Sequence, residues 1–152
     1  MSLDFELLFT QTRHSVVRLN GYINDVTPDH TGVLDYRMYE IEGCLRALEE
    51  LNEELSFIKK MYFEKAYKVL NEYKEVDERL RGFGKKGERK REKKRLLGEF
   101  VSLAIPIVNR GGDACRKLED NIELDKARRK IKRYETGVET YCQLKGISFL
   151  ED

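Results

Sequence analysis

The chain has 152 residues, of which 40% are hydrophobic and 38% are charged, and its formal net charge is +1. This length fits one domain, and a charged fraction well above the usual ~25% favours long helices and coiled coils. The longest apolar run, residues 100–108, is too short to span a bilayer, and the charged first 25 residues do not resemble a secretory signal. We therefore expect a soluble, cytoplasmic protein with a single helical domain at 1–147 and a C-terminal tail at 148–152.

The charge is distributed unevenly along the chain. Residues 1–78 have a net charge of −7, residues 79–133 of +11 and residues 134–152 of −3. The densest basic stretch is residues 85–95, where eight of the eleven side chains are Lys or Arg. A near-neutral total that is divided in this way predicts a local surface for an anionic partner.

The first expected element is a helix that begins at Ser2 as its cap and ends near Asp25. Residues 27–32 then predict a turn. From Leu34 to about Leu80, apolar residues recur at spacings of three and four, which predicts one unbroken helix about 65–70 Å long. The residues of this seam are Met38, Ile41, Leu45, Leu48, Leu51, Leu55, Ile58, Tyr62, Ala66, Val69, Tyr73, Val76 and Leu80. Because so long a helix would extend past its partners, we expect a homo-oligomer that covers the excess seam.

A glycine-rich loop at 82–87 is expected to precede a third helix. This helix runs from about Glu88 to Asn109 and is apolar on all sides over 96–108, which is typical of the centre of a bundle. Pro106 is expected to kink or end it, because proline cannot donate the helical hydrogen bond.

A fourth helix is expected after a stop at Gly111-Gly112, with Asp113 as its cap and Gly146 as its C-terminal cap near Lys145. The four helices predict an all-α fold, an antiparallel bundle of about four helices with one long central hairpin. The expected seam of the fourth helix comprises Ala114, Leu118, Ile122, Ala127, Ile131, Tyr134, Val138, Tyr141 and Leu144. Its expected contribution to the core comes from Leu118, Ile122, Ile131, Tyr134 and Val138.

Two sets of basic residues are candidates for binding phosphates. The first comprises Lys85, Lys86, Arg89, Lys90, Arg91, Lys93, Lys94 and Arg95. In a helix several of these side chains are four apart and repel one another, at the end where the helix dipole also disfavours cations. The second set, on the fourth helix, comprises Arg128, Arg129, Lys132 and Arg133. If the third and fourth helices are neighbours, both sets share a face that suits a phosphate backbone.

Three kinds of partner are open for this basic face. They are nucleic acid (RNA or DNA), an acidic protein surface such as Glu49–Glu54 of the same or a neighbouring chain, and anionic lipid. Phe83, in the loop before the basic stretch, either stacks on a base or anchors the loop.

We expect a non-enzymatic protein that binds nucleic acid, or an accessory subunit of the size that suits a larger ribonucleoprotein assembly. The alternative is a helical scaffold or adaptor that assembles through charged and coiled-coil surfaces. No cofactor and no metal site are expected, since His14 and His30 are isolated in the sequence. Cys44, Cys115 and Cys142 are widely spaced and are expected to be small core residues.

An acidic pattern supplies one remote alternative, a Mg²⁺-dependent enzyme. Glu49-Glu50-Leu51-Asn52-Glu53, followed by Glu72 and Glu75, resembles the carboxylate elements of the MazG-type all-α nucleotide pyrophosphohydrolases. The resemblance implies four carboxylates from two helices around Mg²⁺. Here the second element ends in Glu75 rather than Asp, and an unbroken helix would hold the two elements about 28 Å apart.

Overall fold

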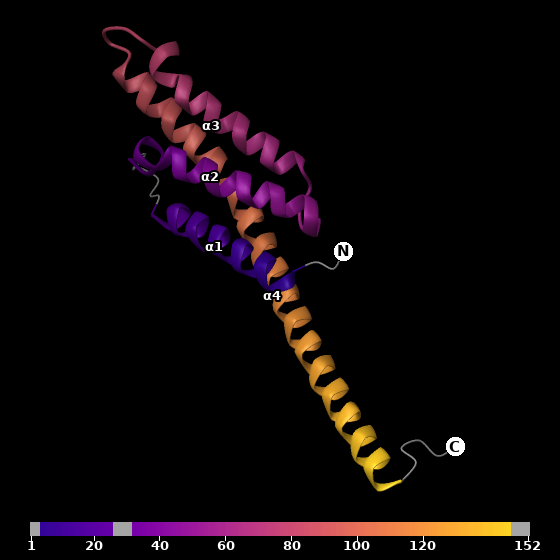
Figure 1. Cartoon of the computed structure of the whole chain (residues 1–152). Coiled ribbons are helices and arrows are strands. Elements are labelled where there is room, and N and C mark those ends of the chain that lie inside the picture. Colours follow the sequence, from indigo (N-terminus) through magenta and orange to yellow (C-terminus); the bar gives the residue numbers. More distant parts are fainter. Residues whose placement is uncertain (1–3, 26–31, 147–152) are drawn as a thin grey trace.

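The computed structural model describes residues 4–25 and 32–146, which form four helices (Figure 1). These are α1 (Phe5–Asn24), α2 (Gly32–Leu55), α3 (Met61–Arg79) and α4 (Lys86–Lys145). The expected all-α class and four-helix antiparallel bundle are confirmed. The expected cap at Ser2, most of the turn at 27–32 and the tail at 148–152 lie outside the described residues.

Helix α1 begins at Asp4, whose side-chain oxygen accepts a hydrogen bond from the backbone N–H of Leu7 at 3.1 Å. This contact satisfies one of the free N–H groups at the helix start. The helix packs on both α2 and α4, and it buries Leu19 completely. Its end at Asn24 is where the apolar pattern predicted it.

The expected unbroken helix over residues 34–80 is wrong, because the chain turns back between α2 and α3. Ser56 has a φ of +49°, and its N–H donates to the carbonyl of Asn52. The Asn52 side chain is buried and accepts from the N–H of Ile58 at 2.8 Å, which closes the turn. Phe57 meets Phe63 edge-on, with ring centroids 6.5 Å apart. The turn residues therefore enter the same core as the helices, and the apolar spacing continues across a break that no glycine or proline marks.

The expected end of a third helix near Pro106 and the expected stop at Gly111-Gly112 are also wrong. Helix α4 is continuous for 60 residues, about 90 Å at 1.5 Å per residue. Gly111 is buried where α1 crosses, and a Cβ there would lie 2.6 Å from Cγ2 of Val16. This glycine therefore permits a close approach between two helices and does not end one. Asp113 pairs with Arg116 one turn further along the same helix.

The core contains the predicted apolar centre of α4 together with the seams of α2 and α3. Leu96, Phe100 and Ile107 of α4 are at most 2% exposed. Helix α3 packs mainly against α4 and forms a hairpin with it, while α2 lies mainly against α1. The other large, fully buried side chains of the core include Leu34, Ile41, Leu45, Leu48, Phe63, Leu70 and Val76.

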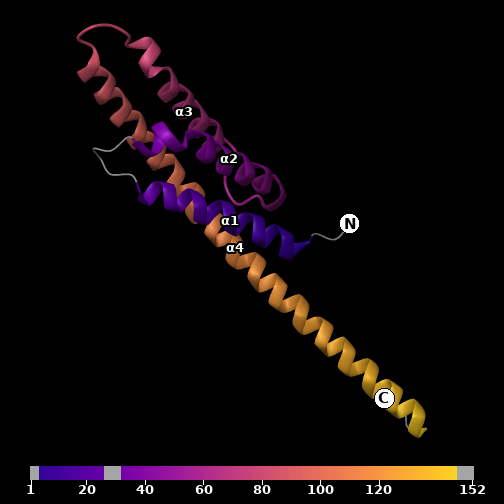
Figure 2. The same cartoon turned by 60° about the vertical axis from the view of Figure 1, so that its left-hand side comes forward.

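Residues 119–145 of α4, which we call the arm, extend beyond the bundle as a single helix about 40 Å long (Figures 1 and 2). The last buried residue of α4 is Leu118. The expected core positions Ile131 and Tyr134 are 59% and 74% exposed, and Val138 lies on the arm with them. These core assignments are wrong because Leu118, the last buried residue of α4, comes only about two turns after Gly111, where α1 crosses. The C-terminal cap at Gly146 is confirmed, with a φ of +66° and bonds to the last helical carbonyls.

Candidate functional site

The first basic set lies at the tip of the α3–α4 hairpin, in the connecting loop and the first turns of α4 (Figure 1). Gly82 and Gly84 in this loop have φ values of +135° and +88°, which favour glycine. The tip is at the opposite end of the molecule from the end of the arm.

Two cations of this set have structural partners. The Arg89 guanidinium donates to the carbonyl of Leu80 at 2.9 Å, so it closes the C-terminal end of α3. Lys93 Nζ lies 3.2 Å from Asp77 and 3.5 Å from Asp35, and 5.5 Å from the ring centre of Tyr73. The Tyr73 hydroxyl donates to Asp35 at 2.7 Å. Lys93 therefore connects α2, α3 and α4, and its side chain is only 18% exposed.

A third cation belongs to an ion-pair network between α3 and α4. Glu92 accepts hydrogen bonds from Arg95 and from Arg79, the latter at 3.1 Å. These two guanidinium groups, Arg95 first, lower the pKa of Glu92 to about 2. Arg95 also pairs with Glu99, and Lys85 pairs with Glu88 at 3.4 Å. The carboxylates between the cations thus relieve much of the like-charge repulsion that the sequence suggested.

Three cations of the first set, Lys86, Lys90 and Arg91, have no ion pair within the described residues. Phe83, in the loop that precedes these residues in the chain, has a fully exposed side chain. The interpretation of Phe83 as a loop anchor is therefore wrong, because this ring does not reach the core.

The second basic set lies on the arm and is not brought next to the first. Arg95 and Arg128 are on the same helix, about 50 Å apart along its axis. The expected shared face of two neighbouring helices is therefore wrong. Arg129 pairs with Asp125 at 2.7 Å, one turn earlier on the arm. Arg128, Lys132 and Arg133 have no ion pair in the part of the chain that the structure describes.

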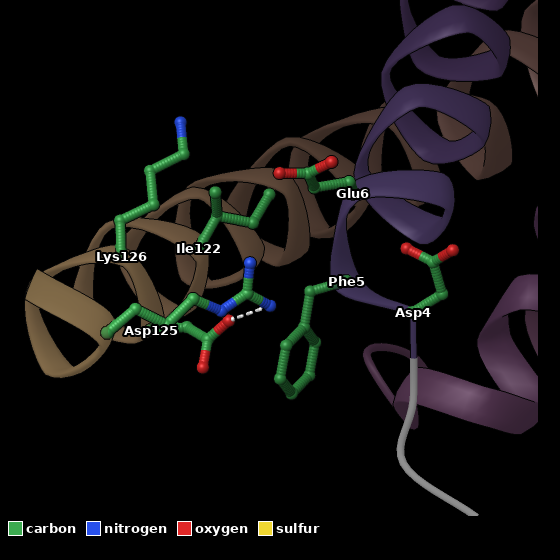
Figure 3. A pocket seen from close by; sticks show the side chains of 7 residues that line it. Asp4, Phe5, Glu6, Ile122, Asp125 and Lys126 are labelled. Atoms are coloured by element: carbon green, nitrogen blue, oxygen red, sulfur yellow. Dashed lines mark ion pairs between the residues drawn. The ribbon is translucent and has the colours of Figure 1, made fainter. Parts of the chain in front are cut away.

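At the base of the arm, the first residues of α1 face α4 across a shallow pocket (Figure 3). Asp4, Phe5 and Glu6 contribute one wall, and Ile122 and Lys126 contribute to the other. This junction is the last contact between the arm and the bundle. From here the arm has no neighbouring helix in the described structure (Figures 1 and 2).

The expected 28 Å separation of the two acidic elements, Glu49–Glu53 and Glu72 with Glu75, assumed one straight helix. The turn between α2 and α3 makes that assumption wrong, so the resemblance is judged on the side chains present. The hollow between these helices is lined by Glu49 and Glu50 from α2, but by Tyr67, Asn71 and Lys74 from α3. Lys74 pairs there with Glu42, so a cation occupies the place where a second carboxylate pair would be needed. Among the described residues, no group of three or more His, Cys, Asp or Glu is arranged to hold a metal ion.

Sequence reasoning treated the apolar residues of the arm as part of the core seam and missed that they form a separate, regular seam that is exposed. It begins at Leu124, and its members alternate at spacings of three and four, which is a heptad pattern. The seam comprises Leu124, Ala127, Ile131, Tyr134, Val138 and Tyr141. The buried seam of α4 has the same alternation but ends at Leu118, six residues before Leu124 instead of seven. At about 100° per residue, Leu124 therefore lies about 120° around the helix from Leu118 and the later seam residues lie further round, so the second seam does not continue the core face.

This change of phase was the signal in the sequence that could have separated the two seams. Read as a single seam through Ile122, the fourth helix looks like one face of a bundle. Read as two strict heptad runs, it has a core segment and an arm segment with different faces. The exposed fractions of Leu124, Ile131 and Tyr141 are 49%, 59% and 58%. Exposed apolar side chains in a regular row are typical of an interaction surface.

The cysteines divide between these two segments. Cys44 and Cys115 are buried, as expected, and burial raises the pKa of both thiols. Cys142 lies on the arm and is half-buried.

Comparison with protein-family models, with curated proteins and with solved structures gave no match for this chain. None of the helices in the described ranges is both long and apolar enough to cross a membrane.

Proposed function

We propose that this protein is a helical scaffold or adaptor that assembles through its arm. The observation that carries this proposal is the row of exposed apolar residues on a helix that leaves the bundle unaccompanied. A single helix in water is marginally stable, because most helical stability in proteins comes from packing an apolar face. The arm has such a face and nothing within the described chain to cover it. A helix from another chain would cover it.

The basic stretch at the hairpin tip supports the same proposal indirectly. Arg89, Lys93 and Arg95 are held by carbonyls and carboxylates of the same chain. These cations therefore stabilise the hairpin, and less of the charge is left for an external anion than the sequence count indicates.

The test is sedimentation of the full chain at low and high salt. We expect dimers or larger assemblies that are lost when Ile131 is replaced by aspartate, since a charge in the seam would have to be buried. Thr136→Asp is the matched control, because it adds the same charge to the arm outside the seam. A wild-type chain that is monomeric at every concentration and salt would contradict the proposal.

Nucleic-acid binding is the second candidate function, and one observation favours it. Phe83 is fully exposed in the loop at the hairpin tip, and α4, which begins after this loop, carries Lys86, Lys90 and Arg91, which lack ion pairs in the described structure. An exposed aromatic ring at the same hairpin tip as cations without ion pairs suits stacking on a base with contacts to phosphates. Arg128, Lys132 and Arg133 on the arm would add contacts to a ligand long enough to reach both sets.

The second candidate is tested by fluorescence anisotropy with labelled RNA and DNA at about 50 and 200 mM salt. The informative variant replaces Lys86, Lys90 and Arg91 with glutamate, since replacing Lys93 or Arg95 would also damage the fold. Replacement of Lys59, Lys65 and Lys68 with glutamate is the control, because it changes the net charge by the same amount at exposed positions away from the tip. We expect weaker binding and a shallower salt dependence in the first variant only. Absence of binding by the wild type at low salt would exclude this function.

A further inference from the structure

We infer that the occupant of the arm's apolar seam is the arm of a second copy of this chain, paired in parallel and in register. The inference rests on the proposed function and specifies its partner. It depends on three properties of the arm: the residues in the seam, the charges that flank it, and the position of the bundle relative to it.

The seam residues suit a two-stranded parallel coiled coil. With Leu124 at heptad position a, the a layers are Leu124, Ile131 and Val138, and the d layers begin with Ala127 and Tyr134. In parallel coiled coils, β-branched residues at a, here Ile131 and Val138, favour two strands when d is Leu, but d here is Ala or Tyr, so the strand number is argued from the flanking charges. The seam from Leu124 to Tyr141 covers almost three heptads, and the capped end at Gly146 follows directly. This is a short coiled coil, so its affinity depends on the flanking charges as well.

The flanking charges are complementary in the parallel register. In a parallel dimer each g residue faces the e residue five positions later on the other chain. Glu123 at g then faces Arg128 at e, and Lys130 at g faces Glu135 at e. Twofold symmetry doubles both pairs, so four attractive contacts flank the seam. Arg128, which has no ion pair within the described monomer, gains a partner in this arrangement.

The antiparallel alternative matches these charges less well. If the two seams overlap fully in opposite directions, Ile131 faces Tyr134, and e residues face e residues. Arg128 then faces Glu135, but Lys130 faces Gly137 and Glu123 faces Leu144. Half of the charged flanking positions would lack a partner.

The bundles do not obstruct a parallel pair. At about 100° per residue, the seam residues lie about 120–220° around the helix from Leu118, so the arm's seam is on roughly the opposite side of α4 from the face that enters the bundle. When two arms meet along their seams, each bundle therefore lies on the outer side of its own helix. Upstream of Leu124 the seam positions become polar, with Asp120 and Lys117, so the contact is confined to the arm.

Disulfide trapping tests the orientation and the register in the full chain. The starting protein carries Cys142→Ser, so that only the new thiol on the arm is accessible. Under mild oxidation we expect Tyr134→Cys to cross-link with itself, because residues at d face their own counterparts in a parallel dimer. Thr136→Cys, on the outer face, is the control and should not cross-link. Thermal unfolding of each variant checks that the bundle is intact.

Charge exchange supplies a second, independent measurement. Arg128→Glu should weaken dimerisation about tenfold or more, because two attractive pairs become repulsive. Adding Glu123→Arg to it restores both pairs in the parallel register and should recover the dimer. Adding Glu135→Arg instead restores pairs only in the antiparallel register.

The outcomes separate this inference from the proposed function. Self-cross-linking at Tyr134→Cys with rescue by Glu123→Arg supports the parallel dimer. Cross-linking only between Ile131→Cys and Tyr134→Cys chains, with rescue by Glu135→Arg, overturns it while the proposed assembly through the arm stands. A monomer under all conditions overturns both.

Discussion

At the level of single residues, the basic stretch is a mixture of structural and free cations. Arg89 closes the end of α3, and Lys93 connects three helices through Asp35, Asp77 and the ring of Tyr73. Lys86 and Lys90, in contrast, have no ion pair within the described residues. A run of Lys and Arg in a sequence does not distinguish these two kinds, because the difference depends on which carboxylates and carbonyls a neighbouring helix presents.

Glu92 gives a pH-dependent prediction at this scale. Its pKa is lowered from 4.5 to about 2 by Arg95 and Arg79, so its negative form is favoured in the folded protein. A carboxyl with a depressed folded pKa stabilises above its unfolded pKa, and this contribution is lost as the pH falls. We expect Glu92→Gln to be less stable than wild type at neutral pH, with the difference vanishing between about pH 4.5 and 2. Chemical denaturation across this range measures it, and a difference that does not depend on pH would contradict the assignment.

At the level of the helices, Gly111 decides how α4 crosses α1. A glycine in a helix costs about 1 kcal/mol relative to alanine, so two adjacent glycines predicted a helix end. The 2.6 Å approach of Val16 to a Cβ at this position shows what the glycine provides. The isopropyl group of Val16 is branched at Cβ and has little freedom to move aside.

We therefore expect Gly111→Ala to lower the free energy of unfolding by about 1–3 kcal/mol, because the added methyl group overpacks the crossing. Gly98→Ala is the matched control: it lies in the same helix, and no atom lies within 4 Å of its added Cβ. The control should stabilise the protein by about 0.5–1 kcal/mol. Urea denaturation of both variants measures the two changes in the free energy of unfolding. If Gly111→Ala also stabilises the protein, α1 does not approach α4 closely at this position.

At the level of the whole molecule, the protein is a bundle with one long extension. The bundle contains all of the described core, while the arm has an apolar seam and, beyond its junction with the start of α1, no neighbouring helix in the described chain (Figures 1 and 2). The two parts therefore differ in what stabilises them. Packing within one chain holds the bundle, whereas we propose that association with another helix stabilises the arm.

This difference predicts how hydrogen exchange depends on protein concentration. Amide protons at 119–145 should become more protected as the concentration rises, because association buries the seam. Those at 96–118 should be unaffected, since their protection comes from the bundle. Exchange measured by mass spectrometry below and above the association midpoint makes the comparison, and Ile131→Asp should abolish the change. Equal protection of both segments at all concentrations would argue against an associating arm.

The sequence by itself determined the helical class, the apolar centre of α4 and the glycine that caps its end. These features follow from local signals, namely the spacing of apolar residues and the conformational freedom of Gly146. The sequence also contained the one-residue shift in the heptad spacing after Leu118. The shift was not recognised because the fourth helix was read as one seam that passes through Ile122.

The tertiary structure alone decided where the chain turns, where it continues and which charges remain free. The turn after Leu55 depends on the Asn52 side chain and on Phe57 meeting Phe63, contacts that exist only once α3 folds back. The continuity of α4 through Gly111 depends on the close approach of α1. The pairing of Lys93 depends on carboxylates far away in sequence. Local propensity shows only which elements are possible, and long-range contacts select among them because their energies exceed the small local preferences.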